Sequence, residues 1–324
     1  MTNIIGFPGL FDKTFTIHRV AFTLFGRDIM WYGIILACCF VLAALYCTRR
    51  APQFGSSSDE FTDLLLWGLP AAVIGCRIYY VANSWDYYSA HPDEIIAIWK
   101  GGLGMYGGII AAALVVLIYG RRHRSNIRGI ADLLALGFAI GQFIGRWANF
   151  VNAEAYGSAT SLPWGMTING GAPVHPTFLY ESLWTLAGFL VLHFYSKHRR
   201  FDGEIALLYA GWYGLARFWL EDLRTDSLMI GHTGISASKV VGGVCVVVCW
   251  GLLIYFYLTK KYPRPYVKAA PAAAAEASAS EQTPEQTPEQ APEQTPEQTE
   301  EQTREPEAPA EAPAKTDEND KKPS

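Results

Sequence analysis

Charged residues are scarce in this sequence: Asp, Glu, Lys and Arg make up 17% of its 324 residues, whereas hydrophobic residues make up 50%. The few charges are also unevenly placed. Residues 1–268 hold 22 Lys and Arg against 16 Asp and Glu, and residues 269–324 hold 4 against 14. The sequence therefore predicts a membrane-embedded body followed by a solvated acidic tail, with no nucleic-acid partner.

Cysteine is also rare, and all six cysteines lie in apolar runs. Buried free thiols behave as small hydrophobic side chains, so we expect no disulfide framework, metal site or cysteine nucleophile. No Ser-His-Asp spacing or cluster of metal ligands is found elsewhere, and no cofactor is expected. The N-terminus lacks a basic stretch followed by a short apolar core and a cleavage site, which predicts no cleaved signal peptide.

Apolar segments near the length of about 20 residues that spans a bilayer recur along the chain. They cover residues 29–47, 63–82, 103–119, 130–150, 176–195, 205–220 and 236–258. The sequence thus predicts an all-α integral membrane protein with seven transmembrane helices. Residues 1–268 form its single membrane domain, and residues 1–28 form an interfacial arm on the outer side.

The loops between these segments alternate in charge. Basic residues gather at positions 49–50, 121–128, 197–200 and 260–268, whereas the loops 83–100, 151–174 and 224–235 contain only Lys100 and Arg224. Basic loops are typical of the cytoplasmic side. With seven spans, this places the N-terminus outside and the C-terminus in the cytoplasm.

The acidic tail, residues 269–324, repeats the sequence Glu-Gln-Thr-Pro. It has no large aliphatic or aromatic side chains, so it cannot bury enough surface to offset its chain entropy. We predict a disordered cytoplasmic segment with no catalytic role.

The most unusual stretch is residues 145–157, which directly follows an apolar segment and reads GRWANFVNAEAYG. An ionisable group at membrane depth costs a few kcal/mol and indicates a functional site. On a continuous helix, Gln142, Arg146 and Asn149 lie at i, i+4 and i+7 and share one face. Alternatively, Arg146 snorkels to the headgroups.

Other unusual polar groups gather at the same outer depth. They are Trp31, Tyr32, Arg77, Tyr79, Tyr80, Tyr106, Asn152, Glu154, His175, Glu181, Tyr213, Arg217, Glu221 and Arg224. Each has a purely structural alternative. The aromatics suit an interfacial belt, the glycines at 101–108 suit close helix packing, Arg217 with Glu221 suits an i, i+4 pair, and His175 suits a helix start. The inner half is expected to hold only ordinary snorkelling Lys and Arg.

Two arginines beside tyrosine and amide donors favour binding of a phosphate, because the guanidinium fork matches phosphate oxygens. The pattern therefore predicts an outer-leaflet site for an anionic lipid headgroup. The main alternative is a multi-pass transporter or flippase for an anionic lipid or solute, which would need polar residues through both leaflets. The other alternative is a structural membrane protein, in which the polar groups would only hold the helices together.

Together these motifs resemble those of the bacterial prolipoprotein diacylglyceryl transferases. The family's signature is similar to residues 145–157, and residues 31–33, 107–108, 175–181 and 213–224 support it. The resemblance covers about residues 29–260. It implies transfer of the diacylglyceryl group of phosphatidylglycerol to the lipobox cysteine of a preprolipoprotein, the first step of bacterial lipoprotein maturation. It also implies the bacterial cytoplasmic (inner) membrane, with the active site facing the outer leaflet.

The resemblance also assigns residues. It implies Arg146, Arg217, Tyr106 and Glu154 as catalytic, and Arg146, Asn149, Tyr32, Asn152, His175 and Glu221 as substrate-binding. Tyr106 is a departure, because some members carry a catalytic histidine there. A tyrosine, with an ordinary pKa near 10, is a poor base at neutral pH. The proton acceptor is left open among the leaving phosphate, Glu154 and no protein base.

Overall fold

The computed structural model describes residues 2–225 and 236–263, which belong to one compact unit. The predicted acidic tail and most of the predicted loop 224–235 lie outside the described residues. Helices dominate the described part. The longer ones are α1 (Trp31–Arg50), α2 (Ser58–Asn83), α4 (Met105–His123), α5 (Ile127–Asn152), α6 (Thr177–Tyr195) and α7 (Glu204–Leu220). A last segment joins α8 (Ala237–Cys245), a π-helical stretch (Val246–Trp250) and α9 (Gly251–Thr259).

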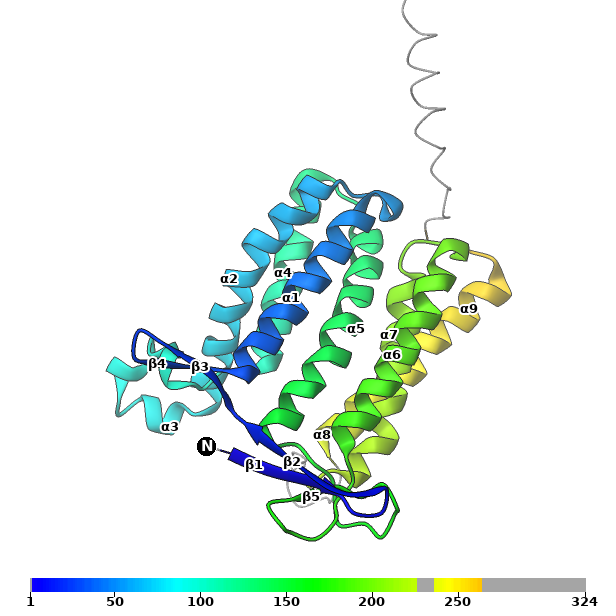
Figure 1. Cartoon of the computed structure of the whole chain (residues 1–324). Coiled ribbons are helices and arrows are strands. Elements are labelled where there is room, and N and C mark those ends of the chain that lie inside the picture. The colour runs from blue at the N-terminus through cyan, green and yellow to red at the C-terminus, as the bar shows by residue number, and fades with distance from the viewer. Residues whose placement is uncertain (1, 226–235, 264–324) are drawn as a thin grey trace, which may run out of the picture. The chain divides into compact units, whose positions relative to one another are not determined.

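These helices form a bundle in which successive members run in opposite directions (Figure 1). Helix α1 packs against α5, α2 packs against α4, and α5 packs against α6 and α7. All strands lie at the end of the bundle where α1 begins and α5 finishes, which we call the strand end (Figure 1). The opposite end carries Arg49, Arg121 and their basic neighbours, and we call it the basic end.

Six helical stretches in the described ranges are long and apolar enough to cross a membrane. They are Trp31–Phe54, Ser58–Asn83, Met105–His123, Ile127–Asn152, Thr177–His198 and Ala237–Thr259. Each corresponds to a segment predicted from the sequence. The remaining predicted segment, 205–220, is the helix α7, whose 17 residues fall short of the usual spanning length. The structure is therefore a mostly helical membrane protein with six candidate spans.

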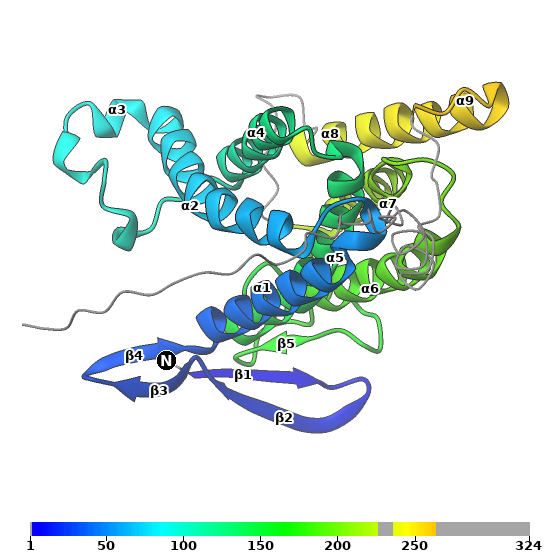
Figure 2. The ribbon, with the colours of Figure 1, turned by 90° about the horizontal axis from the view of Figure 1, so that it is seen from above.

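The predicted interfacial arm consists of two β-hairpins. Strand β1 (Thr2–Phe7) pairs with β2 (Phe11–His18) and with β5 (Thr167–Ile168), and β3 (Val20–Leu24) pairs with β4 (Arg27–Met30). Viewed along the bundle, the β3–β4 hairpin and the loop that carries α3 (Trp85–Tyr88) project to the same side as separate arms (Figure 2). The structure thus adds five short strands to the expected helices, all outside the candidate spans.

Arg77 organises the loop between α2 and α4. Its guanidinium donates to the backbone carbonyls of Glu94, Ile95, Gly101 and Gly102 at 2.7–2.9 Å, and its side chain is buried. A charged donor that satisfies four carbonyls fixes the loop conformation. Arg77 therefore serves the fold of the strand end.

Close approach of backbones explains the glycines near Tyr106. A Cβ added to Gly107 of α4 would lie 2.1 Å from the Gly75 carbonyl oxygen of α2, so any side chain there would force the two helices apart. Gly214 of α7 and Gly242 of α8 meet in the same way. Small residues let membrane helices pack backbone to backbone. Close packing, one of the two interpretations of these glycines, is what the structure shows.

The basic end contradicts the expectation of ordinary snorkelling side chains. Arg50 is buried and donates to Gln53, Tyr46 and Ser196, which lie on three different segments. Arg199 is buried beside Asp202, with Nε 3.6 Å from Oδ1. These arginines are buried because loop carbonyls and hydroxyls surround them, which hydropathy along the sequence does not reveal.

Asp132, fully buried in α5, caps helix α7. Its two carboxylate oxygens accept hydrogen bonds from the backbone N–H groups of Gly203 and Ala206, each at 2.8 Å. The first N–H groups of a helix have no partner within the helix, and the helix dipole favours a carboxylate there. Asp132 thus ties the start of α7 to the first turns of α5.

Candidate active site

One carboxylate, Glu181 of α6, gathers three arginines at the strand end. Its Oε1 lies 2.9 Å from Arg224 Nη1, and its Oε2 lies 3.9 Å from Arg217 Nη2 and in direct contact with Arg146 Nη2. Glu181 itself is 6% exposed. Because α5, α6, α7 and the segment after α7 each contribute one of these groups, the helix packing creates the cluster.

Arg217 has further partners on its own helix. Its Nε donates to the Tyr213 hydroxyl at 2.8 Å, and its Nη1 lies 3.6 Å from Glu221 Oε2. The predicted i, i+4 pair is therefore present, but it belongs to a larger assembly. Three guanidiniums thus meet the carboxylates of Glu181 and Glu221 in a largely buried setting. Guanidinium donors gathered at low dielectric attract an anion, so this arrangement suits a phosphate ester.

Asn149 and Glu154 form a second group directly after the arginine on α5. Asn149 Nδ2 donates to Glu154 Oε1 at 3.0 Å. The chain turns back on itself here, because Ala153 and Ala155 both adopt positive φ, at 52° and 53°. The Tyr32 hydroxyl of α1 interacts electrostatically with Glu154 and Arg146. The structure therefore brings Tyr32, Asn149 and Glu154 to the edge of the arginine cluster.

Asn152 and His175 have different surroundings. The backbone carbonyl of Asn152 accepts a hydrogen bond from Arg19 Nη2 at 2.7 Å. His175 accepts from the Gly157 N–H through its carbonyl at 2.9 Å, and its ring Nδ1 lies 3.3 Å from the Tyr180 hydroxyl. Among the described contacts, neither side chain reaches the arginine cluster, and both residues hold the segment that follows α5 in place.

Gly157, which closes the signature stretch, has no room for a side chain. An added Cβ would lie 2.7 Å from the Leu223 carbonyl oxygen and 2.7 Å from His175 Cβ. Ser158 N–H donates to that same Leu223 carbonyl at 2.7 Å. Gly157 thus lets the segment after α5 pass beside the segment that carries Arg224.

Tyr106 lies apart from these groups in the structure. It opens helix α4, is 41% exposed and packs against Tyr79, with the ring centroids 6.0 Å apart. Within the described residues, its ring contacts α2 and not the arginines. Its assignment as catalytic remains a prediction.

Two residues of the cluster, Glu181 and Arg224, were not among the predicted site residues. Both appear in the sequence as polar groups of the outer depth, but their spacing carries no sign that they meet. Charge balance is the signal that could have found them. Two arginines at membrane depth need a carboxylate partner, and Glu181 is the acidic residue that begins the fifth apolar segment.

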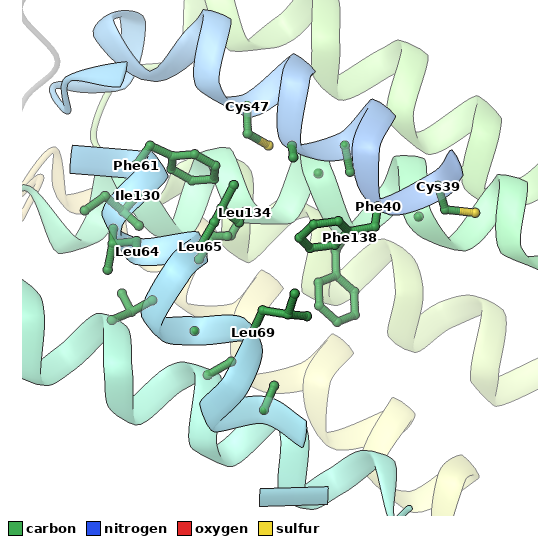
Figure 3. Close-up of a pocket in the computed structure, with 18 of the residues that line it drawn as sticks. Cys39, Phe40, Cys47, Phe61, Leu64, Leu65, Leu69, Ile130, Leu134 and Phe138 are labelled. Carbon is green, nitrogen blue, oxygen red and sulfur yellow. The ribbon is translucent and has the colours of Figure 1, made fainter. Parts of the chain in front are cut away.

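An apolar cavity of about 410 Å³, lined by α1, α2, α4 and α5, lies near the cluster, and several of its lining side chains are exposed at the surface of the bundle. Figure 3 shows side chains of α1, α2 and α5 pointing into it, among them Phe40, Leu69, Leu134 and Phe138. Gln142 is the single amide among its lining residues. The cavity reaches Leu36, whose Cδ2 would lie 3.9 Å from a Cβ added at Gly145. The cavity therefore adjoins the helix turn that carries Arg146.

The fold and site define a helical membrane protein in which an anion-attracting arginine cluster adjoins an apolar cavity. The model of the prolipoprotein diacylglyceryl transferase family matches residues 19–255. The chain belongs to this family, as the motifs predicted.

Curated relatives give the same result. The chain is similar to the phosphatidylglycerol–prolipoprotein diacylglyceryl transferase of Clostridioides difficile, at 41% identity over 245 residues, which cover 76% of this chain and 97% of the relative. It is also similar to the enzyme of the same name from Finegoldia magna, at 46% identity over 221 residues, covering 68% and 89%. A third, from Lysinibacillus sphaericus, is 40% identical over 255 residues, covering 74% and 92%.

Proposed function

We propose that this chain transfers the diacylglyceryl group of phosphatidylglycerol to the lipobox cysteine of preprolipoproteins. The cysteine sulfur attacks the glyceryl carbon that carries the phosphate, so a C–S bond forms and the C–O bond to the phosphate breaks. The electron pair of the broken bond leaves with glycerol phosphate. The thiol proton goes to the leaving phosphate or to Glu154. The arginine cluster on Glu181 is the observation that carries this proposal.

The cluster has the charge that the reaction requires. A phosphodiester carries one negative charge, and the departing phosphate monoester carries up to one more. Arg146 and Arg217 hold the phosphate oxygens, and Arg224 adds a third guanidinium on the same carboxylate. Preorganised cations in a dry site stabilise charge that develops on a leaving group without reorganising. The site therefore favours departure of the phosphate.

The groups beside the cluster position the reactants. Tyr32, Asn149 and Glu154 lie at its edge, and Glu221 holds Arg217 from the far side. Asn152 and His175 contribute indirectly, because they hold the turn that presents Glu154. The apolar cavity beneath Arg146 suits acyl chains. The family and the curated relatives are transferases, which argues against a transporter.

The orientation follows from charge. We propose seven spans with α7 as the short seventh, the strand end and N-terminus outside, and the basic end in the cytoplasm. The Arg and Lys residues at the ends of α1, α4 and α9 support this orientation. The site then faces the outer leaflet of a bacterial cytoplasmic membrane, where phosphatidylglycerol and the signal peptide of a translocated preprolipoprotein meet.

The direct test uses the purified full chain with phosphatidylglycerol and a lipobox peptide, followed by mass spectrometry. We expect a peptide whose mass has increased by one diacylglyceryl group, together with free glycerol phosphate. A matched peptide with serine in place of the lipobox cysteine should stay unmodified. If the cysteine peptide is unchanged while the protein is folded, the proposed function is wrong.

A further inference from the structure

Gln142 is a polar side chain in an apolar cavity, and the arginine cluster does not account for it. It lies on α5 one helical turn before Arg146. Its Oε1 accepts a hydrogen bond from the Tyr209 hydroxyl of α7 at 2.5 Å. The acceptor of the amide is therefore engaged, and no acceptor for its NH2 group is found in the part of the chain that the structure describes, which leaves this group as a donor beside the cavity. A hydrogen-bond donor that has no acceptor in an apolar space destabilises the protein. The cost exceeds the net stability that a formed hydrogen bond contributes.

Tyr209 connects this amide to the site. The ring of Tyr209 stacks on that of Tyr213, with centroids 6.3 Å apart and an interplanar angle of 19°. The Tyr213 hydroxyl in turn accepts from Arg217 Nε at 2.8 Å. The helix face that holds the second arginine of the cluster thus also orients Gln142.

The spacing matches the chemistry of a diacyl phospholipid. Four residues of α-helix rise about 6 Å, which is the distance along the axis from Arg146 to Gln142. About five covalent bonds, or roughly 6 Å when extended, separate a lipid phosphorus from the nearest ester carbonyl carbon. With the phosphate on Arg146 and the acyl chains in the cavity, an ester carbonyl lies level with the amide.

From this placement, and resting on the proposed function, we infer that Gln142 donates a hydrogen bond to a fatty-acid ester carbonyl of the lipid substrate. Tyr209 acts as the positioning residue that fixes the amide. The pair makes the enzyme selective for ester-linked lipids over ether-linked lipids, which carry the same phosphate and the same reacting C–O bond but no carbonyl.

A purely structural role is the alternative, since an amide and a phenol also bind membrane helices together. The two roles differ in one measurable respect. If the hydrogen bond only joins α5 to α7, its loss should lower turnover of every lipid by the same factor. If Gln142 also binds the ester, its loss should lower turnover of diacyl phosphatidylglycerol and leave turnover of the dialkyl lipid unchanged.

The experiment measures kcat/KM of the purified full chain with a lipobox peptide and two lipids of equal chain length, diacyl and dialkyl phosphatidylglycerol. We expect wild type to prefer the diacyl lipid by about 5-fold, which corresponds to about 1 kcal/mol, the usual net contribution of one hydrogen bond. Gln142→Leu should lower the diacyl value to the dialkyl value and leave the latter unchanged. Tyr209→Phe should lose part of the preference.

Leu134→Ala is the matched control, because Leu134 lines the same cavity without a polar group. It should lower both values by the same factor. Gln142→Met, which keeps the length of the side chain, replaces Gln142→Leu if that variant does not fold, with the same expectation. Equal turnover of both lipids by wild type, or an equal loss on both in the Gln142 variants, would overturn the inference. Failure of wild type to modify the peptide with either lipid would instead overturn the proposed function.

Discussion

Arginines lie in the interior at both ends of the bundle, but the groups that contact them differ. At the basic end, Arg50 donates to three side chains on separate segments, and Arg199 is enclosed by carbonyls and Asp202. At the strand end, three guanidiniums share Glu181. The first arrangement satisfies each arginine with groups of the protein. The second gathers three guanidiniums at one carboxylate, an arrangement that suits an anionic ligand.

This difference separates the arginines that hold loops in place from those that we propose to bind phosphate. Burial alone does not do so, because Arg50 and Arg77 are buried whereas the three arginines of the cluster are only partly buried. A guanidinium has five N–H donors in a fixed plane. Where backbone carbonyls and neutral side chains occupy them, the arginine locks a loop. Where several guanidiniums converge on the same carboxylate, they form the kind of cationic group that binds phosphate oxygens.

The largest effect is expected at Arg146. Arg146→Ala should lower kcat/KM for phosphatidylglycerol by at least about 10²–10³-fold, the loss typical of removing one charge-stabilising donor. Arg146→Lys should recover little, because a point charge lacks the guanidinium fork. Folding should be kept, since Glu181 retains Arg217 and Arg224. The measurements are lipobox-peptide turnover and the apparent Tm, and wild-type turnover in Arg146→Ala would exclude phosphate binding by this residue.

A smaller effect is expected between the two ends, at Gly141. A Cβ added there meets no heavy atom within 4 Å, and Gly141 lines the apolar cavity. Gly141→Val should fill part of the acyl space and lower kcat/KM about 10-fold, the scale of a modest steric clash of 1–3 kcal/mol. Gly251→Val on α9 is the matched control, because its Cβ is equally unobstructed but lies outside the cavity. Equal turnover by the two variants would show that the cavity is not part of the strand-end site.

Substitution of Tyr106 should lower kcat/KM less than the substitutions of Arg146 and Gly141. It is 41% exposed and packs on Tyr79, and a tyrosine hydroxyl at neutral pH serves mainly as a hydrogen-bond donor. We expect Tyr106→Phe to lose less than about 10-fold, well below the 10²–10⁴-fold that a positioned general base supplies. Tyr106→His should be tolerated. The test is the pH–rate profile of wild type and Tyr106→Phe, and a basic limb that disappears together with the activity would identify Tyr106 as the base.

The smallest effect on catalysis is expected at the basic end. Arg50→Met removes several hydrogen bonds to a buried charge and should destabilise the protein by about 2–4 kcal/mol. Its partners are neutral, so no opposite charge is left unpaired. The apparent Tm should fall, while kcat/KM per folded molecule stays at the wild-type value. A folded but inactive Arg50→Met variant would contradict the view that the arginines of the basic end serve the fold and not catalysis.

Much of this arrangement could be predicted from the sequence. Segment length and apolarity located the six candidate spans of the described residues, because the bilayer imposes both, and they also located the shorter helix α7. The stretch 145–157 pointed to Arg146, because a charged side chain at membrane depth is costly and therefore indicates a functional site. The hairpins of residues 2–30 were missed, because alternation in short strands is a weak signal beside strong helical hydropathy. The buried network of Arg50 and Arg199 was missed for a different reason: its partners are distant in sequence.

The site could be predicted only in part, for the same reason. Asn149 and Glu154 are neighbours along the chain, so their pairing follows from local geometry. The contacts of Glu181 with Arg146 and Arg224 cross between segments, and no periodicity specifies them. Gln142 shares a helix face with Arg146, which the sequence indicates, but the cavity that it borders exists only after four helices have packed.

Because Asp132 of α5 caps α7, it fixes the start of α7 at a defined height along α5. These two helices carry Arg217 and Arg146. Both helices run from the basic end to the strand end, with Arg146 fourteen residues beyond Asp132 and Arg217 fourteen residues beyond Gly203. Equal counts give an equal rise of about 21 Å, so the contact of Asp132 with the start of α7 at the basic end places the two guanidiniums at the same height at the strand end. We therefore expect Asp132→Ala to lower kcat/KM in folded protein, and Asp132→Asn, which keeps one acceptor, to lower it less. The alignment of the proposed phosphate site is thus set at the opposite end of the bundle from the site itself.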